Sequence, residues 1–230
     1  MKWRGLDESS SAGVSVRPLT QVLQERRELG ERYTPAEVVA LYQRAIDEIG
    51  SSGLLERALK PGDPAPRFEL PDENFKPVTS ETLLGHGNAI LCFFRGRWCP
   101  FDVAQLEAMN EVVPQIQAAG ASLVAISPQT QHQAFLMHDQ HKLRFPLLSD
   151  TGNKVARQFG LVYRVPDYQQ QVYRRSFVNL PFANGDDSWE LPVPATYVVG
   201  KDGRIVYARV DVDYRQRPEP VEILNTAVNP

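Results

Sequence analysis

Cys99 is the residue of this chain best placed to act as a nucleophile. It follows an apolar run over 89–94 and a basic loop that contains Arg95 and Arg97. From Val103 onward the apolar residues recur every three or four positions, which predicts a helix that begins at the cysteine. The first N–H groups of a helix lack internal partners and the helix dipole is positive there, so a thiolate is stabilised. The two arginines add positive charge, and we therefore predict a reactive thiol.

Two further residues close to Cys99 were considered as partners in its chemistry. Cys92 lies inside the apolar run, where it is expected to be buried and inert, so it is not assigned as a partner for Cys99. Asp102 falls in the first helical turn, where it either only starts the helix or takes part in the chemistry. A carboxylate that faces the sulfur disfavours the thiolate, yet it can also accept a proton. The candidate catalytic residues are therefore Cys99, Asp102 and Arg95.

Length, charge and composition exclude several classes of function. A chain of 230 residues with 42% hydrophobic residues supports one well-buried core with an appendage. The net charge of -3 gives no electrostatic reason to expect nucleic acid or a membrane surface as a partner. Two cysteines and four histidines fit neither a disulfide framework nor a metal site. No apolar run approaches the roughly 20 residues of a membrane span. We expect a cytoplasmic protein that uses no cofactor or metal.

Strand and helix patterns alternate around Cys99, as an α/β fold requires. Apolar runs predict strands over 89–94, 122–126, 195–199 and 205–210. Helical spacing predicts helices after Cys99, over 130–141 and over 153–159. The first two strands flank a helix and should be parallel, whereas a Gly-Lys-Asp-Gly turn joins the last two as a hairpin. The central sheet is therefore predicted to be mixed.

Two regions depart from this core pattern. Residues 1–60 form a serine-rich, poorly ordered start and an arm of two amphipathic helices, over 18–32 and 34–49. The apolar side of the arm is either a binding surface or, as is usual for amphipathic helices, a cover for part of the core or for a partner subunit in a homodimer. The main domain spans 61–230 and contains an insertion at 161–190 in which periodicity fails. Four aromatic residues of the insertion either wall a substrate cleft or pack the insertion down: Tyr168, Tyr173, Phe177 and Phe182.

The loop Phe94-Arg95-Gly96-Arg97-Trp98-Cys99-Pro100-Phe101 resembles that of the thioredoxin superfamily, and within it the peroxiredoxin-like AhpC/TSA family. The resemblance continues through 120–128, 148–153, 191–198 and 213–220, and covers most of the chain from Pro61 to Pro220. It implies a thioredoxin-like fold with a mixed central sheet flanked by helices. Trp98, Pro100 and Pro194 would then bind substrate, with Pro194 as the cis-proline that faces the active cysteine in thioredoxins.

The chain departs from the family pattern at two positions of this loop. Asp102 stands where such proteins usually carry the second cysteine of Cys-x-x-Cys, and Gly96 stands where typical peroxiredoxins carry Thr or Ser. The resemblance therefore implies a one-cysteine peroxidase, in which Cys99 reduces hydrogen peroxide or an alkyl hydroperoxide and becomes a sulfenic acid. An external thiol, thioredoxin or a small molecule, would restore it. Two alternatives stay open: a monothiol disulfide-exchange protein and a catalytically silent binding module.

Overall fold

The protein is described over residues 17–228 by a computed structural model, whose centre is a five-stranded sheet in the order β5-β4-β3-β8-β9. The strands are β3 (Ala89–Phe93), β4 (Ser122–Ser127), β5 (Leu147–Ser149), β8 (Ala195–Val199) and β9 (Ile205–Val210). β3, β4 and β5 are parallel, whereas β8 and β9 run antiparallel to their neighbours. The predicted mixed sheet is confirmed, and so is the hairpin between the last two strands.

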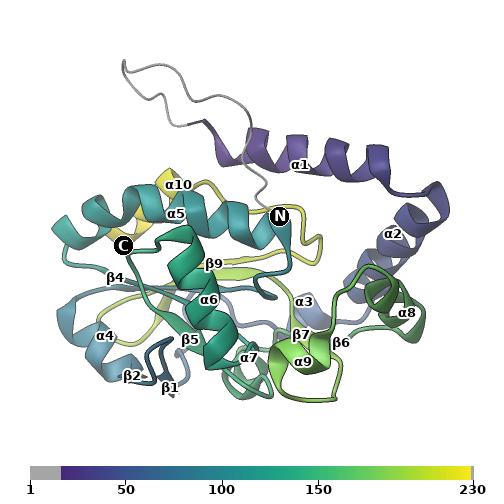
Figure 1. Cartoon of the computed structure of the whole chain (residues 1–230). Coiled ribbons are helices and arrows are strands. Elements are labelled where there is room, and N and C mark those ends of the chain that lie inside the picture. Colours follow the sequence, from purple (N-terminus) through teal and green to yellow (C-terminus); the bar gives the residue numbers. More distant parts are fainter. Residues whose placement is uncertain (1–16, 229–230) are drawn as a thin grey trace.

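The central strand β3 is buried on both faces because side chains alternate along it and helices cover both sides (Figure 1). Cys92 and its even-numbered neighbours pack beneath α5 (Pro100–Ala118), α6 (Gln131–His141) and α10 (Pro220–Val228). Leu91 and its odd-numbered neighbours face α3 (Leu54–Arg57), α4 (Ser80–His86) and α7 (Lys154–Gln158). A small antiparallel ribbon of β1 (Glu69–Pro71) and β2 (Pro77–Thr79) adjoins this second face. This arrangement places the end of β3 and the start of α5 close together.

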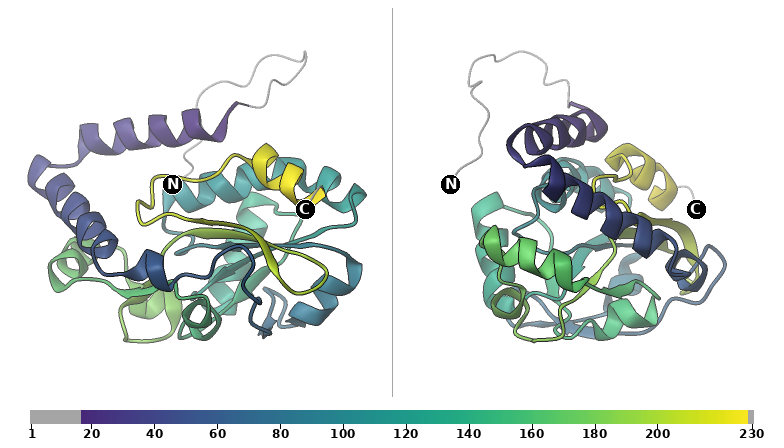
Figure 2. Two further views of the ribbon diagram at one scale, coloured as in Figure 1. Left: turned by 180° about the vertical axis from the view of Figure 1, so that it is seen from behind. Right: turned by 90° about the vertical axis from the view of Figure 1, so that its right-hand side faces the viewer.

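The N-terminal arm folds back on its own chain. α1 (Leu19–Tyr33) lies along the outer side of α5, and α2 (Ala36–Gly50) turns down toward the insertion (Figure 2). Its buried apolar residues come from both helices: Leu19, Leu23, Ala45, Ile46 and Ile49. The interpretation that the arm covers its own core is therefore confirmed for these residues. The serine-rich start over 1–16 lies outside the described residues.

The insertion has regular structure that the sequence pattern did not predict. It contains β6 (Val162–Arg164), α8 (Asp167–Arg175), α9 (Leu180–Asn184) and β7 (Glu190–Pro192), and β6 pairs with β7. Periodicity fails because α8 is largely polar, and it buries glutamines as well as apolar side chains. Of its aromatic residues Tyr173 is buried, whereas Phe177 and Phe182 are exposed. Across residues 17–228, none of the helices has both the length and the apolar character needed to cross a bilayer.

Candidate active site

Cys99 lies at the N-cap of α5, directly after the loop that leaves β3, as the sequence predicts. Its N–H donates to the carbonyl of Gly96 at 3.0 Å, which closes the loop into a tight turn. Gly96 has a φ of +146°, and a Cβ there would lie 2.7 Å from Nε1 of Trp98. This contact gives a physical reason for glycine where typical family members carry Thr or Ser.

The guanidinium of Arg95 holds the sulfur from one side. Its Nη2 lies 2.8 Å from Sγ of Cys99, within the range of a charge-assisted hydrogen bond. The guanidinium stacks on the ring of Tyr214 at 3.8 Å and lies 5.0 Å from the ring of Trp98. Arg95 is only 3% exposed, so little water competes for this contact. Of all residues in the predicted site, Arg95 is placed most directly to stabilise a thiolate.

The sulfur itself is covered. Cys99 has no exposed surface and shares an apolar cluster with Leu19 and Leu23 of α1, and with Phe101, Ala104, Trp98 and Tyr214. Burial raises the pKa of the Cys99 thiol above its ordinary value, although Arg95 opposes this shift. The sequence predicts a stabilised thiolate, and in this structure burial opposes it, because Leu19 and Leu23 of α1 pack over the sulfur and exclude solvent.

Several charged or titratable groups besides Arg95 influence the sulfur. Asp102 raises the pKa of the Cys99 thiol through its charge, whereas Arg217 lowers it. The sulfur makes no full capping hydrogen bond, but the backbone N–H of Asp102 is near enough to favour the thiolate. From the surrounding elements, four more groups are coupled electrostatically to Cys99: Arg26 of α1, Tyr42 of α2, Tyr163 of β6, and Tyr214.

The carboxylate of Asp102 is buried and fully engaged. Oδ2 accepts the backbone N–H of Arg95 at 2.9 Å and that of Gly96 at 3.3 Å. Oδ1 accepts from the guanidinium of Arg217. A carboxylate committed to these donors fixes the loop and neutralises Arg217, so the geometry favours a positioning role for Asp102 over proton transfer.

The segment that follows β9 supplies residues to which the sequence analysis gave no role. Tyr214 packs on Cys99 and under Arg95, and Arg217 pairs with Asp102. Both belong to the stretch 213–220, which carries part of the family resemblance. That resemblance was the available signal, because no pattern within the stretch shows what its side chains contact.

The remaining predicted residues lie around the loop in different orientations. Arg97 donates to Oε1 of Gln133 at 3.2 Å, so its charge is directed to α6. Trp98 packs 5.3 Å from the ring of Tyr173, and its buried Nε1 has no hydrogen-bond partner among the described residues. Pro100 is exposed, and its carbonyl accepts from Arg26.

The peptide bond before Pro194 is trans, so the predicted cis-proline is wrong. The chain must continue in extended form from β7 into β8, and hydrogen bonds hold it on both sides. The N–H of Val193 donates to the carbonyl of Leu161 at 2.9 Å, and the carbonyl of Pro194 accepts the N–H of Asp211 at 3.0 Å. Pro194 is buried at the start of β8.

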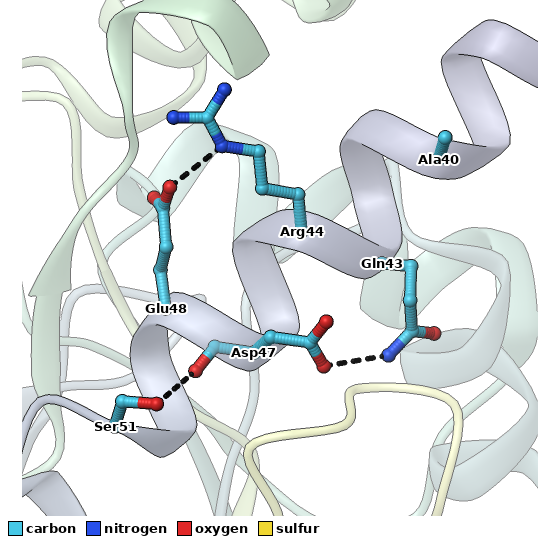
Figure 3. A pocket seen from close by; sticks show the side chains of 6 residues that line it. All are labelled: Ala40, Gln43, Arg44, Asp47, Glu48 and Ser51. Carbon is cyan, nitrogen blue, oxygen red and sulfur yellow. Dashed lines mark hydrogen bonds and ion pairs between the residues drawn. The ribbon is translucent and has the colours of Figure 1, made fainter.

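A shallow depression elsewhere, on α2, is not connected with this chemistry (Figure 3). Its polar groups pair with one another: Arg44 with Glu48 at 2.8 Å, and Gln43 with Asp47 at 2.9 Å. Among residues 17–228, no three His, Cys, Asp or Glu side chains gather as a metal site requires.

Comparisons with known proteins agree on one family. The family description AhpC/TSA matches residues 61–208. The chain is 30% identical over 164 residues to the chloroplast peroxiredoxin Q of Arabidopsis thaliana, covering 70% of this chain and 64% of that protein. It is 28% identical over 103 residues to peroxiredoxin Bcp of Escherichia coli, covering 45% and 65% respectively. The crystal structure of peroxidoxin BcpB from Mycobacterium tuberculosis has a TM-score of 0.58 at 21% identity, covering 74% and 96%. The predicted thioredoxin-like fold is confirmed.

Proposed function

The chain belongs to the AhpC/TSA family of the thioredoxin superfamily, and we propose that it reduces hydroperoxides through Cys99 alone. Membership supports a peroxidase-type thiol oxidoreductase, with a peroxide as substrate and a thiol as reductant. The observation that carries the proposal is the 2.8 Å contact between Nη2 of Arg95 and Sγ of Cys99. A guanidinium at this distance stabilises the thiolate, which is the form of cysteine that attacks.

The chemistry proceeds in two stages. The Cys99 thiolate attacks one peroxide oxygen, the S–O bond forms as the O–O bond breaks, and the leaving alkoxide or hydroxide takes a proton to become alcohol or water. The sulfenic acid then condenses with an external thiol to a mixed disulfide and water, and a second thiol releases reduced Cys99. Nε of Arg95 is buried and makes no hydrogen bond among the described residues, with Oδ2 of Asp102 at 3.9 Å, and we propose it as a donor to a peroxide or sulfenate oxygen.

The position of the other thiol supports a single-cysteine mechanism. Cys92 is the only further cysteine of the chain, and it is buried in β3. Burial raises the pKa of the Cys92 thiol to about 12, so it is protonated at neutral pH. Resolution by an external thiol also fits a reducing, cytoplasmic location, which we propose on this ground. Trp98, Pro100 and Pro194 remain proposed contacts for the substrate.

The complete burial of Cys99 favours one alternative, a thioredoxin-fold binding module without turnover. Monothiol exchange is disfavoured by the same observation, because a protein disulfide is far bulkier than a peroxide. Peroxidase activity requires α1 to uncover the sulfur at least transiently, and such local opening is common in proteins.

The test is to treat the reduced, full-length protein with a small excess of hydrogen peroxide or cumene hydroperoxide in the presence of a sulfenic acid trap. Peptide mass spectrometry should place the adduct on Cys99. Cys92→Ala should retain the adduct, and Cys99→Ser should abolish it. A Cys99 that stays reduced, or an adduct that forms on Cys92 instead, would overturn the proposal and favour the binding module.

A further inference from the structure

Arg217 is a buried guanidinium behind the active-site loop whose donors point in three directions. Nε donates to Oε1 of Gln105 at 2.7 Å, and Nη2 donates to the carboxylate of Asp102. Nη1 donates to the backbone carbonyls of Tyr214 at 2.5 Å and Gln216 at 2.6 Å. The planar fork of arginine permits this arrangement, whereas the single ammonium of lysine cannot reach all of these acceptors.

Two of these partners are the supports of Arg95. Asp102 accepts the backbone N–H of Arg95 at 2.9 Å, which fixes the point from which its side chain leaves the loop. The ring of Tyr214 lies 3.8 Å from the guanidinium carbon of Arg95, and this stacking holds the guanidinium end of the side chain. Arg217 binds both supports, through the Asp102 side chain and the Tyr214 backbone.

We propose that Arg217 is a positioning residue that holds the Arg95 guanidinium at the Cys99 sulfur, through Asp102 on one side and Tyr214 on the other. The proposal deepens the proposed function and rests on it for the reaction that the positioned arginine serves. A long arginine side chain has many rotamers, and without supports the guanidinium leaves the close 2.8 Å contact with the sulfur for part of the time.

The test measures the pH profile of Cys99 alkylation by a small probe such as iodoacetamide, in the full-length protein. The midpoint of the profile reports the pKa of the thiol in its reactive conformation, whereas the plateau reports access. Arg217 also favours the thiolate through its own charge, as Arg95 does, while Asp102 opposes it. Arg26, Tyr42, Tyr163 and Tyr214 also interact electrostatically with the sulfur, and they stay unchanged in every variant.

Arg217→Lys keeps the charge and removes the fork. We expect its midpoint to rise by about one pH unit, which lowers the rate at neutral pH roughly tenfold. Arg209→Lys is the matched control, because Arg209 also holds a carboxylate, that of Asp211 at 2.9 Å, but on the exposed surface of β9. Its midpoint should equal that of the natural chain. A midpoint that Arg217→Lys leaves unmoved would overturn the proposal.

A second variant separates positioning from stability. Arg217→Met removes the close cationic partner of the buried Asp102 carboxylate and leaves only the Arg95 guanidinium, at 3.9 Å. Adding Asp102→Asn removes that charge, while an amide oxygen can still accept the loop N–H groups. The double variant should regain most of the lost resistance to denaturant. Its alkylation midpoint is compared with that of Asp102→Asn alone, because removing the Asp102 charge by itself lowers the pKa of the thiol, and it should lie above that reference. A midpoint equal to that of Asp102→Asn would show that Arg217 acts on folding alone. Alkylation needs no peroxide, so a natural chain that fails to turn over peroxide overturns the proposed function without deciding this test.

Discussion

Arg26 of α1 donates a hydrogen bond to the backbone carbonyl of Pro100, the residue that directly follows Cys99. The same guanidinium forms an ion pair with Glu107 of α5 at 3.5 Å. Glu219 holds the start of α1 by accepting the N–H groups of Leu19 and Thr20 at 3.0 and 2.8 Å. Polar contacts thus hold α1 in place on both sides of Leu19 and Leu23, the apolar residues that cover the sulfur.

Loosening α1 should therefore expose Cys99. Arg26→Ala removes the link to Pro100 and the ion pair with Glu107, and we expect it to weaken docking by about 1–2 kcal/mol, which raises the alkylation plateau roughly 5- to 30-fold. Arg27→Ala is the control, because the ion pair of Arg27 with Glu31 at 2.8 Å lies along the exposed surface of α1 and does not link α1 to α5. Equal plateaus for the two variants would mean that probes reach the sulfur without movement of α1.

Removing the positive charge next to the sulfur should suppress the thiolate. Arg95→Ala leaves Cys99 with the desolvation and the Asp102 charge that raise the thiol pKa. An opposite charge in contact lowers such a pKa by about 1–3 units, so the alkylation midpoint should rise by at least one pH unit. Arg97→Ala should leave the midpoint in place, because Arg97 is directed to Gln133. If both variants shifted the midpoint equally, the 2.8 Å contact would not be what stabilises the thiolate.

The position of Cys99 could be predicted from sequence because local patterns determine it. An apolar run, a glycine-containing turn and helical spacing meet at this residue, and each reflects contacts between near neighbours. The parallel order of β3 and β4 follows in the same way from the helix between them. The trans bond before Pro194 was missed because it depends on partners at Leu161 and Asp211, which are distant in sequence.

The burial of the sulfur and the partner of Asp102 could not be predicted. The periodicity of α1 shows that it has an apolar side, but not that Leu19 and Leu23 cover Cys99. Asp102 and Arg217 are 115 residues apart, and either one alone looks like an ordinary charged residue. Such pairs are set by the tertiary fold, so a single sequence left the role of Asp102 open between two alternatives.

The buried thiol of Cys92 should make stability depend on pH at the alkaline end. Burial raises the pKa of the Cys92 thiol to about 12 in the folded protein, whereas in the unfolded chain it is about 8.5. Below about pH 8.5 the thiol is protonated in both states and its contribution to folding stability is complete. As pH rises from about 8.5 toward 12 only the unfolded chain ionises, so this contribution is lost. Above pH 9 the free energy of unfolding of the natural chain should therefore fall by about 1.4 kcal/mol per pH unit more than that of Cys92→Ala. All other titrating groups are the same in the two proteins, so their effects cancel in the comparison. Denaturant unfolding at pH 8 and pH 10 measures this difference. Parallel losses in the two proteins would contradict a protonated, buried Cys92.

Gly96→Thr should destabilise this protein. The new Cβ would lie 2.7 Å from Nε1 of Trp98 and 3.4 Å from Oε1 of Gln129, on a backbone with a φ of +146°. We expect a loss of about 1–3 kcal/mol in the free energy of unfolding. Gly30→Ala is the control, and it should raise the free energy of unfolding instead of lowering it. A Cβ at Gly30 meets nothing within 4 Å, and alanine is more favourable than glycine within a helix by up to about 1 kcal/mol. Adding Trp98→Ala to Gly96→Thr should recover the part of the loss that comes from the clash and leave the part that comes from φ. If the double variant recovers nothing, Trp98 is not the reason that glycine stands in this loop.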